Sequence, residues 1–338
     1  MKAAVLHEIG KPLTIEEVPT PSPGPGQVLI RVEASGVCHS DLHLADGDWD
    51  LLRPITKTPL ILGHEVAGRV AELGEGVTGL KVGDRVGVPW IHWTCGECEF
   101  CKEGRETLCL KQKVTGCMVD GGFAEYLLAP ATHAAPLPDC LTSAEAAPLL
   151  CAGLTVYKAL KASGIQRGQR LAVFGAGGLG HLAIQIARAM GVQVGAVDVA
   201  DDKLEFAKSQ GAEWTANSTA EPVHKKCRSM GGMHVAMVTA AHPSAYETAL
   251  RCLRRGGTVA VVGMANAPFK ASAASLISGE TRIIASAVGT RDDLRELFAM
   301  VEKYPIRCRI ETRPLDQVLQ VFDQLRRGEV LGRLVLVP

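Results

Sequence analysis

The sequence predicts an α/β protein with a mostly-β first half and a doubly wound parallel sheet in its second half. Short apolar runs separated by Gly- and Pro-rich turns fill residues 1–130, a pattern typical of antiparallel strands. From residue 170 onward strand-like and helix-like segments alternate, which indicates a parallel sheet covered by helices. A glycine-rich turn joins the first strand of that series to its helix.

Length and composition narrow the class of protein. A chain of 338 residues is long for one core and predicts two domains, which we place at 1–150 with 288–338 and at 151–287. A net charge of zero gives no indication of a nucleic acid or a membrane surface as partner. No apolar run reaches the length of a membrane span, and the first residues lack the features of a leader. We therefore expect a cytoplasmic protein.

Eleven cysteines is a high number for a cytoplasmic chain, and a reducing compartment favours metal binding over disulfides. Some cysteines stand in spacings that suggest ligands. The others show no such spacing and are expected to be small buried residues: Cys117, Cys140, Cys227, Cys252 and Cys308.

The first half reads as a barrel or sandwich. A turn-rich connector (PTPSPGPG) covers residues 19–26. The expected strands are 2–6, 13–17, 28–34, 66–73, 85–88 and 123–128.

The segment from Cys38 to His43 (CHSDLH) concentrates reactive side chains in six residues. Such groups are costly to bury unless they are satisfied. We interpret it as a loop in which Cys38 binds a metal and Ser40 and His43 move a proton. The alternative is an ordinary polar loop with one buried thiol.

His64 and Glu65 follow the apolar run 59–62. A histidine in this position can simply be a core residue, but together with Cys38 it suggests a catalytic zinc. Such a zinc takes about three protein ligands and keeps one position open. Cys38, His64 and a later cysteine or Glu65 complete this set, and Asp41 is expected to orient the imidazole of His64.

The strongest local signal is the run Cys95-Gly-Glu-Cys98-Glu-Phe-Cys101 with Cys109 beyond it. Four thiolates at this spacing can enclose one tetrahedral zinc with no open position, which predicts a structural site. The alternatives are an iron–sulfur site or unligated thiols, although the spacing does not match the bacterial ferredoxin run.

The second half contains a dinucleotide-binding pattern. A buried strand at 170–174 is followed by a glycine turn, a helix at 181–190 and a strand at 193–197 that ends at Asp198. The glycines allow the backbone to approach a pyrophosphate, and Asp198 would accept hydrogen bonds from both ribose hydroxyls. Asp198 would repel a 2′-phosphate, so NAD is favoured over NADP; the alternative is a helix N-cap. The turn residues are Gly175, Gly177, Gly178, Leu179 and Gly180.

The alternation continues through the rest of the second half. Strands are expected at 234–239, 257–262 and 281–287, with helices at 144–150, 153–163, 202–210, 244–254 and 271–278. Ligands bind at the carboxyl edge of such a sheet, which makes Val262 and Val288 further cofactor candidates. The tail, with helices at 292–304 and 315–327 and a strand at 334–337, reads as a return to the first domain.

A catalytic zinc, a structural zinc and an NAD fold together predict hydride transfer from an alcohol. Zinc would act as a Lewis acid on the alcohol oxygen, and hydride would pass to the nicotinamide. The proton would leave through Ser40, the cofactor ribose and His43, a residue type that can exchange protons near neutral pH.

Over essentially its whole length the chain resembles the zinc-dependent alcohol dehydrogenases of the medium-chain dehydrogenase/reductase superfamily. The resemblance rests on Gly36-Val-Cys38-His-Ser40-Asp, Gly63-His64-Glu65, the four-cysteine set, Leu150-Cys151-Ala-Gly-Leu-Thr155 and the glycine turn. It implies a GroES-like catalytic domain, a Rossmann domain for NAD, two zinc ions per chain and a homotetramer of the bacterial and yeast type.

The resemblance also implies individual roles. Cys38, His64 and Cys151 would bind the catalytic zinc, with Glu65 as an exchangeable fourth ligand, and Ser40 and His43 match the proton relay. Cofactor contacts are implied for His39 and Arg333 at the pyrophosphate, Thr155 at the nicotinamide and Lys203 at the adenosine ribose. Trp49 and Trp90 match bulky residues of the pocket for small primary alcohols, or else are core aromatics.

One departure bears on the substrate. The segment 49–59 is slightly longer than in the small-alcohol bacterial enzymes, which leaves room for a longer or ω-functionalised alcohol such as an ω-hydroxy acid. The rival enzymes are polyol, threonine and formaldehyde dehydrogenases. A zinc-lacking reductase, or a non-catalytic NAD-binding protein such as a lens crystallin, is the rival of another class.

Overall fold

The computed structural model describes residues 1–50 and 52–338, which divide into two compact units. The first unit comprises Met1–Cys151, Gly289–Lys303 and Cys308–Pro338. The second comprises Ala152–Val288 and Tyr304–Arg307. The predicted domain bounds, 1–150 with 288–338 and 151–287, stay a prediction. Leu51, in the segment expected to edge the substrate, lies outside the described residues.

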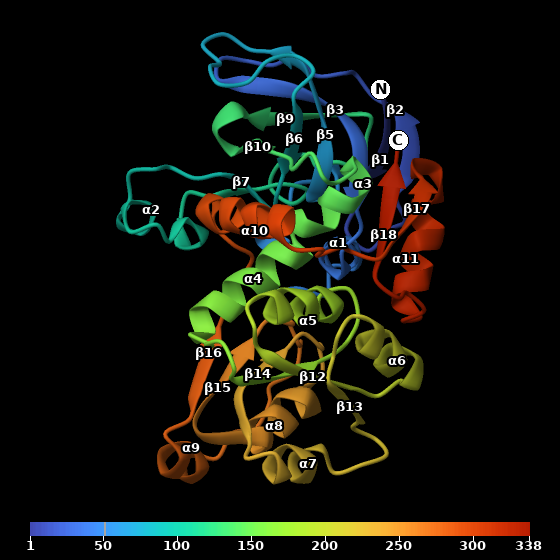
Figure 1. Ribbon diagram of the computed structural model, residues 1–338. Helices are drawn as coiled ribbons and strands as arrows, with labels where there is room; N and C mark the ends of the chain where they lie inside the picture. The colour runs from blue at the N-terminus through green and yellow to red at the C-terminus, as the bar shows by residue number, and fades with distance from the viewer. Residues whose placement is uncertain (51) are drawn as a thin grey trace. The chain divides into compact units, whose positions relative to one another are not determined.

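The first unit is built mainly of antiparallel strands, and its largest sheet has the order β10-β6-β5-β3-β18-β17 with β9 also paired to β3 (Figure 1). These strands are β3 (Gln27–Gly36), β5 (Glu65–Leu73), β6 (Arg85–Val88), β9 (Tyr126–Pro130), β10 (Ala135–Pro136), β17 (Ile310–Pro314) and β18 (Arg333–Val337). Two smaller sheets contain β1 (Lys2–Leu6), β2 (Thr14–Glu17) and β4 (Leu60–Ile61), and β7 (Ile91–Trp93) and β8 (Lys113–Val114). The mostly-β first domain is confirmed.

The pairing of β3 with β5 positions the residues that follow β3 and those that precede β5. Gly36, the last residue of β3, is in register with Glu65, the first residue of β5. Two residues beyond β3 the chain reaches Cys38, and one residue before β5 it passes His64. Antiparallel pairing therefore brings two distant sequence motifs to the same end of the sheet.

Helices of the first unit cover the sheets at several points. They are α1 (His39–Asp46), α2 (Glu99–Lys102), α3 (Ser143–Ala146), α10 (Arg291–Lys303) and α11 (Val318–Arg326), with 3₁₀ turns η1 (Arg53–Ile55), η2 (Glu106–Leu108), η3 (Ala131–His133), η4 (Ala147–Leu150) and η5 (Leu315–Gln317). The apolar face of α11, with Phe322 and Leu325, packs into a core shared with β1, β4 and α1.

The interpretation of residues 38–43 as a loop is wrong, because Cys38 is the N-cap of α1 and the reactive residues lie on the first turns of that helix. The helix ends at Gly47, whose φ of 74° supplies the left-handed cap that glycine adopts without cost. Cys140, expected to be buried, is exposed.

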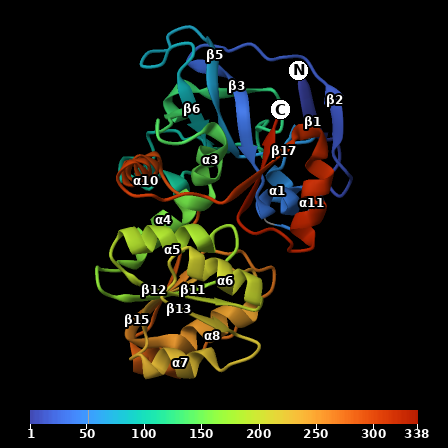
Figure 2. The same cartoon turned by 45° about the vertical axis from the view of Figure 1, so that its right-hand side comes forward.

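The second unit is a parallel sheet of order β13-β12-β11-β14-β15-β16. Numbered along the chain, this is the order 3-2-1-4-5-6 of dinucleotide-binding folds. Figure 2 shows α5 and α6 on one face of the sheet and α7 and α8 on the other, so the doubly wound prediction is confirmed. The strands are β11 (Arg170–Phe174), β12 (Gln193–Asp198), β13 (Trp214–Asn217), β14 (Met233–Val238), β15 (Leu253–Val261) and β16 (Arg282–Ala285).

The helices of the second unit are α4 (Ala152–Ser163), α5 (Gly180–Ala189), α6 (Asp201–Ser209), α7 (Val223–Ser229), α8 (Pro243–Cys252) and α9 (Ala273–Gly279). Strand β13 and helix α7 were not predicted, because their short segments have weak apolar periodicity. Within the described part of the chain, no helix combines the length and apolarity needed to cross a bilayer.

Candidate functional site

The first candidate centre is a buried group of mixed donors within the first unit. One ligand atom each from Cys38, His64, Glu65 and Cys151 lies within 4.8 Å of all the others. They come from the N-cap of α1, the start of β5 and the residue after η4. The structure therefore brings together the four residues proposed for the catalytic zinc.

Asp41 ties the segments of this centre to one another. Its carboxylate accepts hydrogen bonds from the backbone N–H of Cys38 at 2.8 Å and of Gly63 at 3.2 Å. The same carboxylate lies 3.0 Å from Nδ1 of His64, and both side chains are fully buried. Since a carboxylate only accepts, Nδ1 of His64 carries a proton, and in the neutral ring Nε2 keeps a free lone pair. The expected contact between Asp41 and the imidazole of His64 is confirmed.

Glu65 and Arg333 form a buried ion pair beside the thiols. Nη2 of Arg333 lies 2.6 Å from Oε1 of Glu65 and 3.5 Å from Sγ of Cys38. A Cβ at Gly36 would stand 2.0 Å from Oε2 of Glu65, so this carboxylate fits only because position 36 is glycine. The pairing was not anticipated from sequence, since Arg333 was assigned to a pyrophosphate.

Charge is concentrated in this centre, and the pKa values reflect it. The pKa of the Cys38 thiol is lowered well below its usual range, first by the hydrogen bond with Cys151 and then by the Arg333 guanidinium, against the effect of burial. Burial raises the pKa of Glu65 to about 7, although Arg333 opposes the change. Burial alone would lower the pKa of His64, but Asp41 raises it well above its usual value.

The donor atoms fit a zinc ion. Nε2 of His64 and Oε2 of Glu65 are buried and have no hydrogen-bond partner among the described residues, a costly state for polar atoms unless another group satisfies them. Two thiols, an imidazole nitrogen and a carboxylate match the donor chemistry that zinc prefers. Their depth supports a reactive centre that excludes bulk water.

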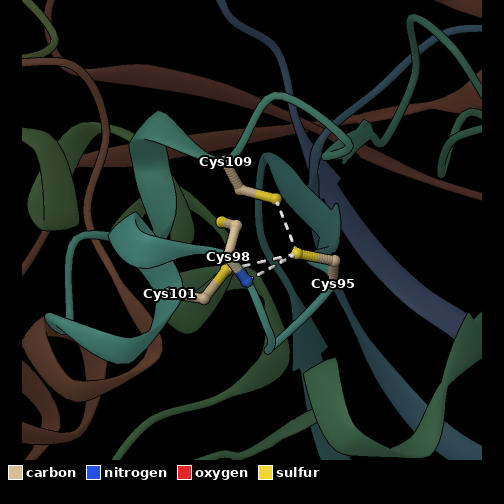
Figure 3. A group of neighbouring side chains, drawn as sticks. All are labelled: Cys95, Cys98, Cys101 and Cys109. Atoms are coloured by element: carbon tan, nitrogen blue, oxygen red, sulfur yellow. Dashed lines mark hydrogen bonds between the residues drawn. The ribbon is translucent and has the colours of Figure 1, made fainter.

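The second candidate centre is the four-cysteine group between β7 and β8. Figure 3 shows the side chains of Cys95, Cys98, Cys101 and Cys109 converging on one point. The sulfur of Cys95 lies 3.9 Å from that of Cys101 and 3.6 Å from that of Cys109. Four sulfurs placed about 2.3 Å from a tetrahedral zinc stand about 3.8 Å apart, so these separations fit a single ion.

Backbone groups favour the thiolate form of one cysteine of this second centre, Cys95. The backbone N–H groups of Glu97 and Cys98 lower the pKa of Cys95 to about 6. The thiols of this group are also free rather than joined in disulfides. The separations are too short for the sulfurs around a multi-iron cluster, so the zinc alternative fits better than an iron–sulfur centre.

An ion pair joins the four-cysteine segment to helix α10 within the first unit. Glu106, between Cys101 and Cys109, receives hydrogen bonds from the backbone and side chain of Arg291, with 2.8 Å between Nη2 and Oε2. Glu106 is 7% exposed. The ion pair between Glu106 and Arg291 thus holds a segment whose Leu110 side chain is exposed to solvent.

The proposed relay residues lie on α1. Ser40 Oγ is 3.5 Å from the sulfur of Cys38. The ring of His43 stacks on Trp49 with a centroid separation of 4.7 Å, and its Nδ1 lies 2.9 Å from the carboxylate of Asp48. Asp48 was missed from sequence; the only signal was an acidic residue just after a glycine that ends a helix.

The two proposed pocket tryptophans contact candidate site residues rather than only the core. Trp90 meets the ring of His64 edge-on at 4.8 Å. Trp49 is almost fully buried, and its ring stacks on that of His43. Their role toward a substrate stays a prediction.

The glycine turn of the second unit has the geometry expected of a pyrophosphate-binding loop. Gly175, directly after β11, has φ 96°. A Cβ at Gly180 would lie 1.8 Å from the carbonyl oxygen of Gly175, so only glycine allows α5 to start there. Asp198 ends β12, and its carboxylate accepts a hydrogen bond from Ala176 N–H at 2.8 Å. The alternative role of Asp198 as a helix cap is wrong, because the N-cap of α6 is Ala200.

The other proposed cofactor residues lie in both units. Thr155 is buried on α4, Lys203 lies on the first turn of α6, and Val262 follows β15. Val288 has φ 41°, an unusual conformation for a β-branched residue and a sign of local strain of the kind found at functional sites. His39 is exposed at the start of α1.

Comparisons with known proteins agree with this geometry. Residues 24–139 match the family described as alcohol dehydrogenase GroES-like domain, and residues 178–303 match the zinc-binding dehydrogenase family. An alcohol dehydrogenase of Geobacillus stearothermophilus is 46% identical over 337 residues, covering 99% of this chain and 98% of that protein.

Solved structures are similar along the whole chain. A cobalt- and zinc-bound thermostable alcohol dehydrogenase from Pyrobaculum aerophilum has a TM-score of 0.90 at 30% identity, covering 100% of this chain and 99% of that one. An acetophenone reductase from Geotrichum candidum in complex with NAD has a TM-score of 0.88 at 30% identity, covering 100% and 97%.

Proposed function

This chain belongs to the zinc-binding dehydrogenase family with an alcohol dehydrogenase GroES-like domain, and on that premise we propose that it oxidises a small alcohol to an aldehyde or ketone by hydride transfer to NAD. The observation that carries this function is the buried donor set of Cys38, His64, Glu65 and Cys151. Zinc, when bound, polarises the alcohol oxygen and lowers its pKa. A zinc-lacking reductase would have no need of these four donors.

Within this centre Cys38, His64 and Cys151 are the proposed ligands. Asp41 holds the His64 ring so that Nε2 faces the other donors. Glu65 is bound by Arg333 through Oε1, and its unpartnered Oε2 makes it the proposed exchangeable ligand. The same guanidinium lies beside the Cys38 sulfur and offsets negative charge there.

The proton released from the alcohol leaves through residues of α1. Ser40 takes it at Oγ and His43 delivers it toward solvent, because the His43 side chain is part-exposed while Cys38 is buried. Trp49 and Trp90 are the proposed walls of the pocket, since each packs against a residue of this machinery.

The cofactor is proposed to bind at the carboxyl edge of the second sheet. Gly175, Gly177, Gly178, Leu179 and Gly180 form the turn for the pyrophosphate, and Asp198 accepts the ribose hydroxyls. A carboxylate in this position opposes a 2′-phosphate, which supports NAD rather than NADP. His39, Thr155, Lys203, Val262, Val288 and Arg333 are the further proposed contacts.

The four-cysteine group is proposed to hold a second zinc with a structural role. A closed set of thiolates leaves no position for substrate. It would instead order a segment with few buried apolar side chains.

Metal analysis and substrate profiling test the function. We expect about two zinc ions per chain and NAD-dependent oxidation of ethanol or benzyl alcohol, with little activity on NADP. A clear preference for sorbitol or L-threonine would assign the chain to another branch of the family. One zinc per chain together with a fully active Cys38→Ser variant would refute the mechanism.

We further propose a cytoplasmic homotetramer. All eleven cysteines are free, as expected in a reducing compartment. Strand β16 lies at the edge of its sheet and leaves Ile283 part-exposed, which supports one contact between copies. Light scattering of the purified protein measures the oligomeric state directly.

A further inference from the structure

His43 has an acidic neighbour, Asp48, that has no role in the proton relay proposed above. Asp48 faces Nδ1 of His43 with both carboxylate oxygens, at 2.9 and 3.0 Å. A carboxylate cannot donate, so Nδ1 must carry the proton in this contact. Nε2 of the neutral ring is then the nitrogen with a free lone pair, and it has no hydrogen-bond partner among the described residues.

The backbone fixes this contact. Gly47 ends α1 in the left-handed conformation and donates its N–H to the carbonyl of His43 at 2.9 Å. A Cβ at Gly47 would lie 2.3 Å from Cγ2 of Ile9, so the turn is held by packing as well as by φ. This turn carries Asp48 back to the side chain of His43.

The ring of His43 is therefore held in two ways. Asp48 binds one edge, and Trp49 covers one face with an angle of 25° between the two rings. Other ionisable groups are less closely placed: the ring of His39 lies 6.4 Å from that of His43, and Asp46 pairs with Arg326 of α11.

We propose that Asp48 is a positioning residue that fixes the Nδ1–H form and the orientation of His43, so that Nε2 accepts the proton that the relay carries away from Ser40. In this step an O–H bond breaks and an Nε2–H bond forms, and the imidazolium then releases the proton to water. The electron pair of the transferred hydride is not involved. The inference rests on the proposed function and names a residue that deepens it.

Substitutions at position 48 separate charge from contact. Asp48→Asn keeps an oxygen that can accept from Nδ1–H but removes the charge, whereas Asp48→Ala removes both. In the zinc-loaded enzyme near pH 7 we expect kcat/KM for alcohol oxidation to fall about threefold to tenfold for the first and about tenfold to a hundredfold for the second. Asp48→Glu should recover part of the activity.

Asp46→Asn is the matched control. Asp46 is an acidic residue at the end of the same helix that contacts Arg326 instead of His43. Its substitution should change kcat/KM by less than about twofold. The loss in the Asp48 variants should shrink as pH rises, because hydroxide can then take the proton directly.

A double substitution tests whether Asp48 acts through His43. In a His43→Asn background, Asp48→Ala should cause no further loss. A readout independent of turnover is NMR of ¹⁵N-labelled histidine, with the His43 signals assigned by their absence in His43→Asn. Wild-type His43 should be in the Nδ1–H form when neutral, and Asp48→Ala should mix the two tautomers.

These outcomes distinguish the two levels of the proposal. If wild-type enzyme oxidises alcohol while Asp48→Ala matches the Asp46→Asn control, or slows the His43→Asn enzyme just as strongly, Asp48 has no positioning role. If wild-type enzyme oxidises no alcohol with NAD, the proposed function fails, and the tautomer measured by NMR still decides whether Asp48 sets the state of His43.

Discussion

The two candidate metal-binding groups of this protein differ in how the chain assembles them. The group of Cys38, His64, Glu65 and Cys151 is fully buried and draws its donors from distant parts of the chain. The four-cysteine group comes from fifteen consecutive positions, and three of its four residues are only half-buried. The first relies on the folded sheet to assemble it, whereas the second holds together a segment that has little core of its own.

The difference also appears in the neighbouring side chains. Asp41 and Arg333 surround the mixed group with buried charges that orient and balance its donors. The four-cysteine group is instead supported by backbone N–H groups and by the ion pair between Glu106 and Arg291. A reactive centre needs tuned partners, while a structural one needs only closure.

The largest expected effect is in the mixed group. Cys38→Ser should lower kcat/KM by about 1,000-fold or more, equivalent to about 4 kcal/mol of transition-state stabilisation, and should reduce zinc from about two to about one per chain. Metal analysis and alcohol-oxidation kinetics measure both. Cys308→Ser, at a buried thiol outside either group, should keep both zinc ions.

Cys109→Ser should instead separate stability from catalysis. We expect loss of one zinc and rapid protease cleavage within residues 95–113, because the segment loses the ligand that closes it. Molecules that remain intact should keep kcat within about threefold, since no substrate contact is removed. A loss of activity as large as that of Cys38→Ser, in intact protein, would erase the contrast between the groups.

Asp41→Asn should weaken the mixed group without removing a ligand. The amide oxygen can still accept from His64 and from Gly63 N–H, but an NH₂ group then faces the backbone N–H of Cys38, which loses its acceptor. Zinc affinity or kcat/KM should drop about tenfold to a hundredfold. Chelator competition monitored by metal release measures the affinity, and an unchanged value would show that the charge of Asp41 and its bond to Cys38 are not needed to hold the mixed group.

The smallest expected effect is at Thr94, the residue just before the four-cysteine segment. Its hydroxyl oxygen lies 3.2 Å from Nε2 of His133. Burial lowers the pKa of His133 to about 4, below the value near 6.5 expected in an unfolded chain. As pH falls, the unfolded chain therefore takes up this proton before the folded chain does. The contribution of His133 to the free energy of unfolding is complete above about pH 6.5 and is lost as pH falls toward 4.

His133→Gln should remove part of that dependence, about 1–2 kcal/mol between pH 6.5 and 4.5. Urea unfolding of the zinc-loaded protein at several pH values measures it. An identical slope in the variant would mean that His133 is not buried neutral in the folded protein.

Much of the fold was predictable because its signals are local. The alternation of strands and helices, the glycine turn and the cysteine spacing each depend on a few neighbouring residues, and the structure bears out the doubly wound sheet and the grouping of the donors. His64 and Cys38 could be paired in advance because few other roles explain such side chains together.

What escaped prediction depends on chain reversals and distant pairings. Helix α1 was interpreted as a loop because its polar residues hide the helical period. The contact of Asp48 with His43 requires the left-handed turn at Gly47, and the pairing of Arg333 with Glu65 joins residues far apart in the sequence. Such contacts leave no periodic trace in the sequence.

The bonds of Asp41 have a consequence for metal loading. One carboxylate holds the backbone on both sides of the mixed group and the imidazole between them. Asp41 therefore limits the freedom of these donors through the protein's own groups, so that a metal does not have to order them alone. Four close donors held in this way favour ions that accept four ligands over those that demand six.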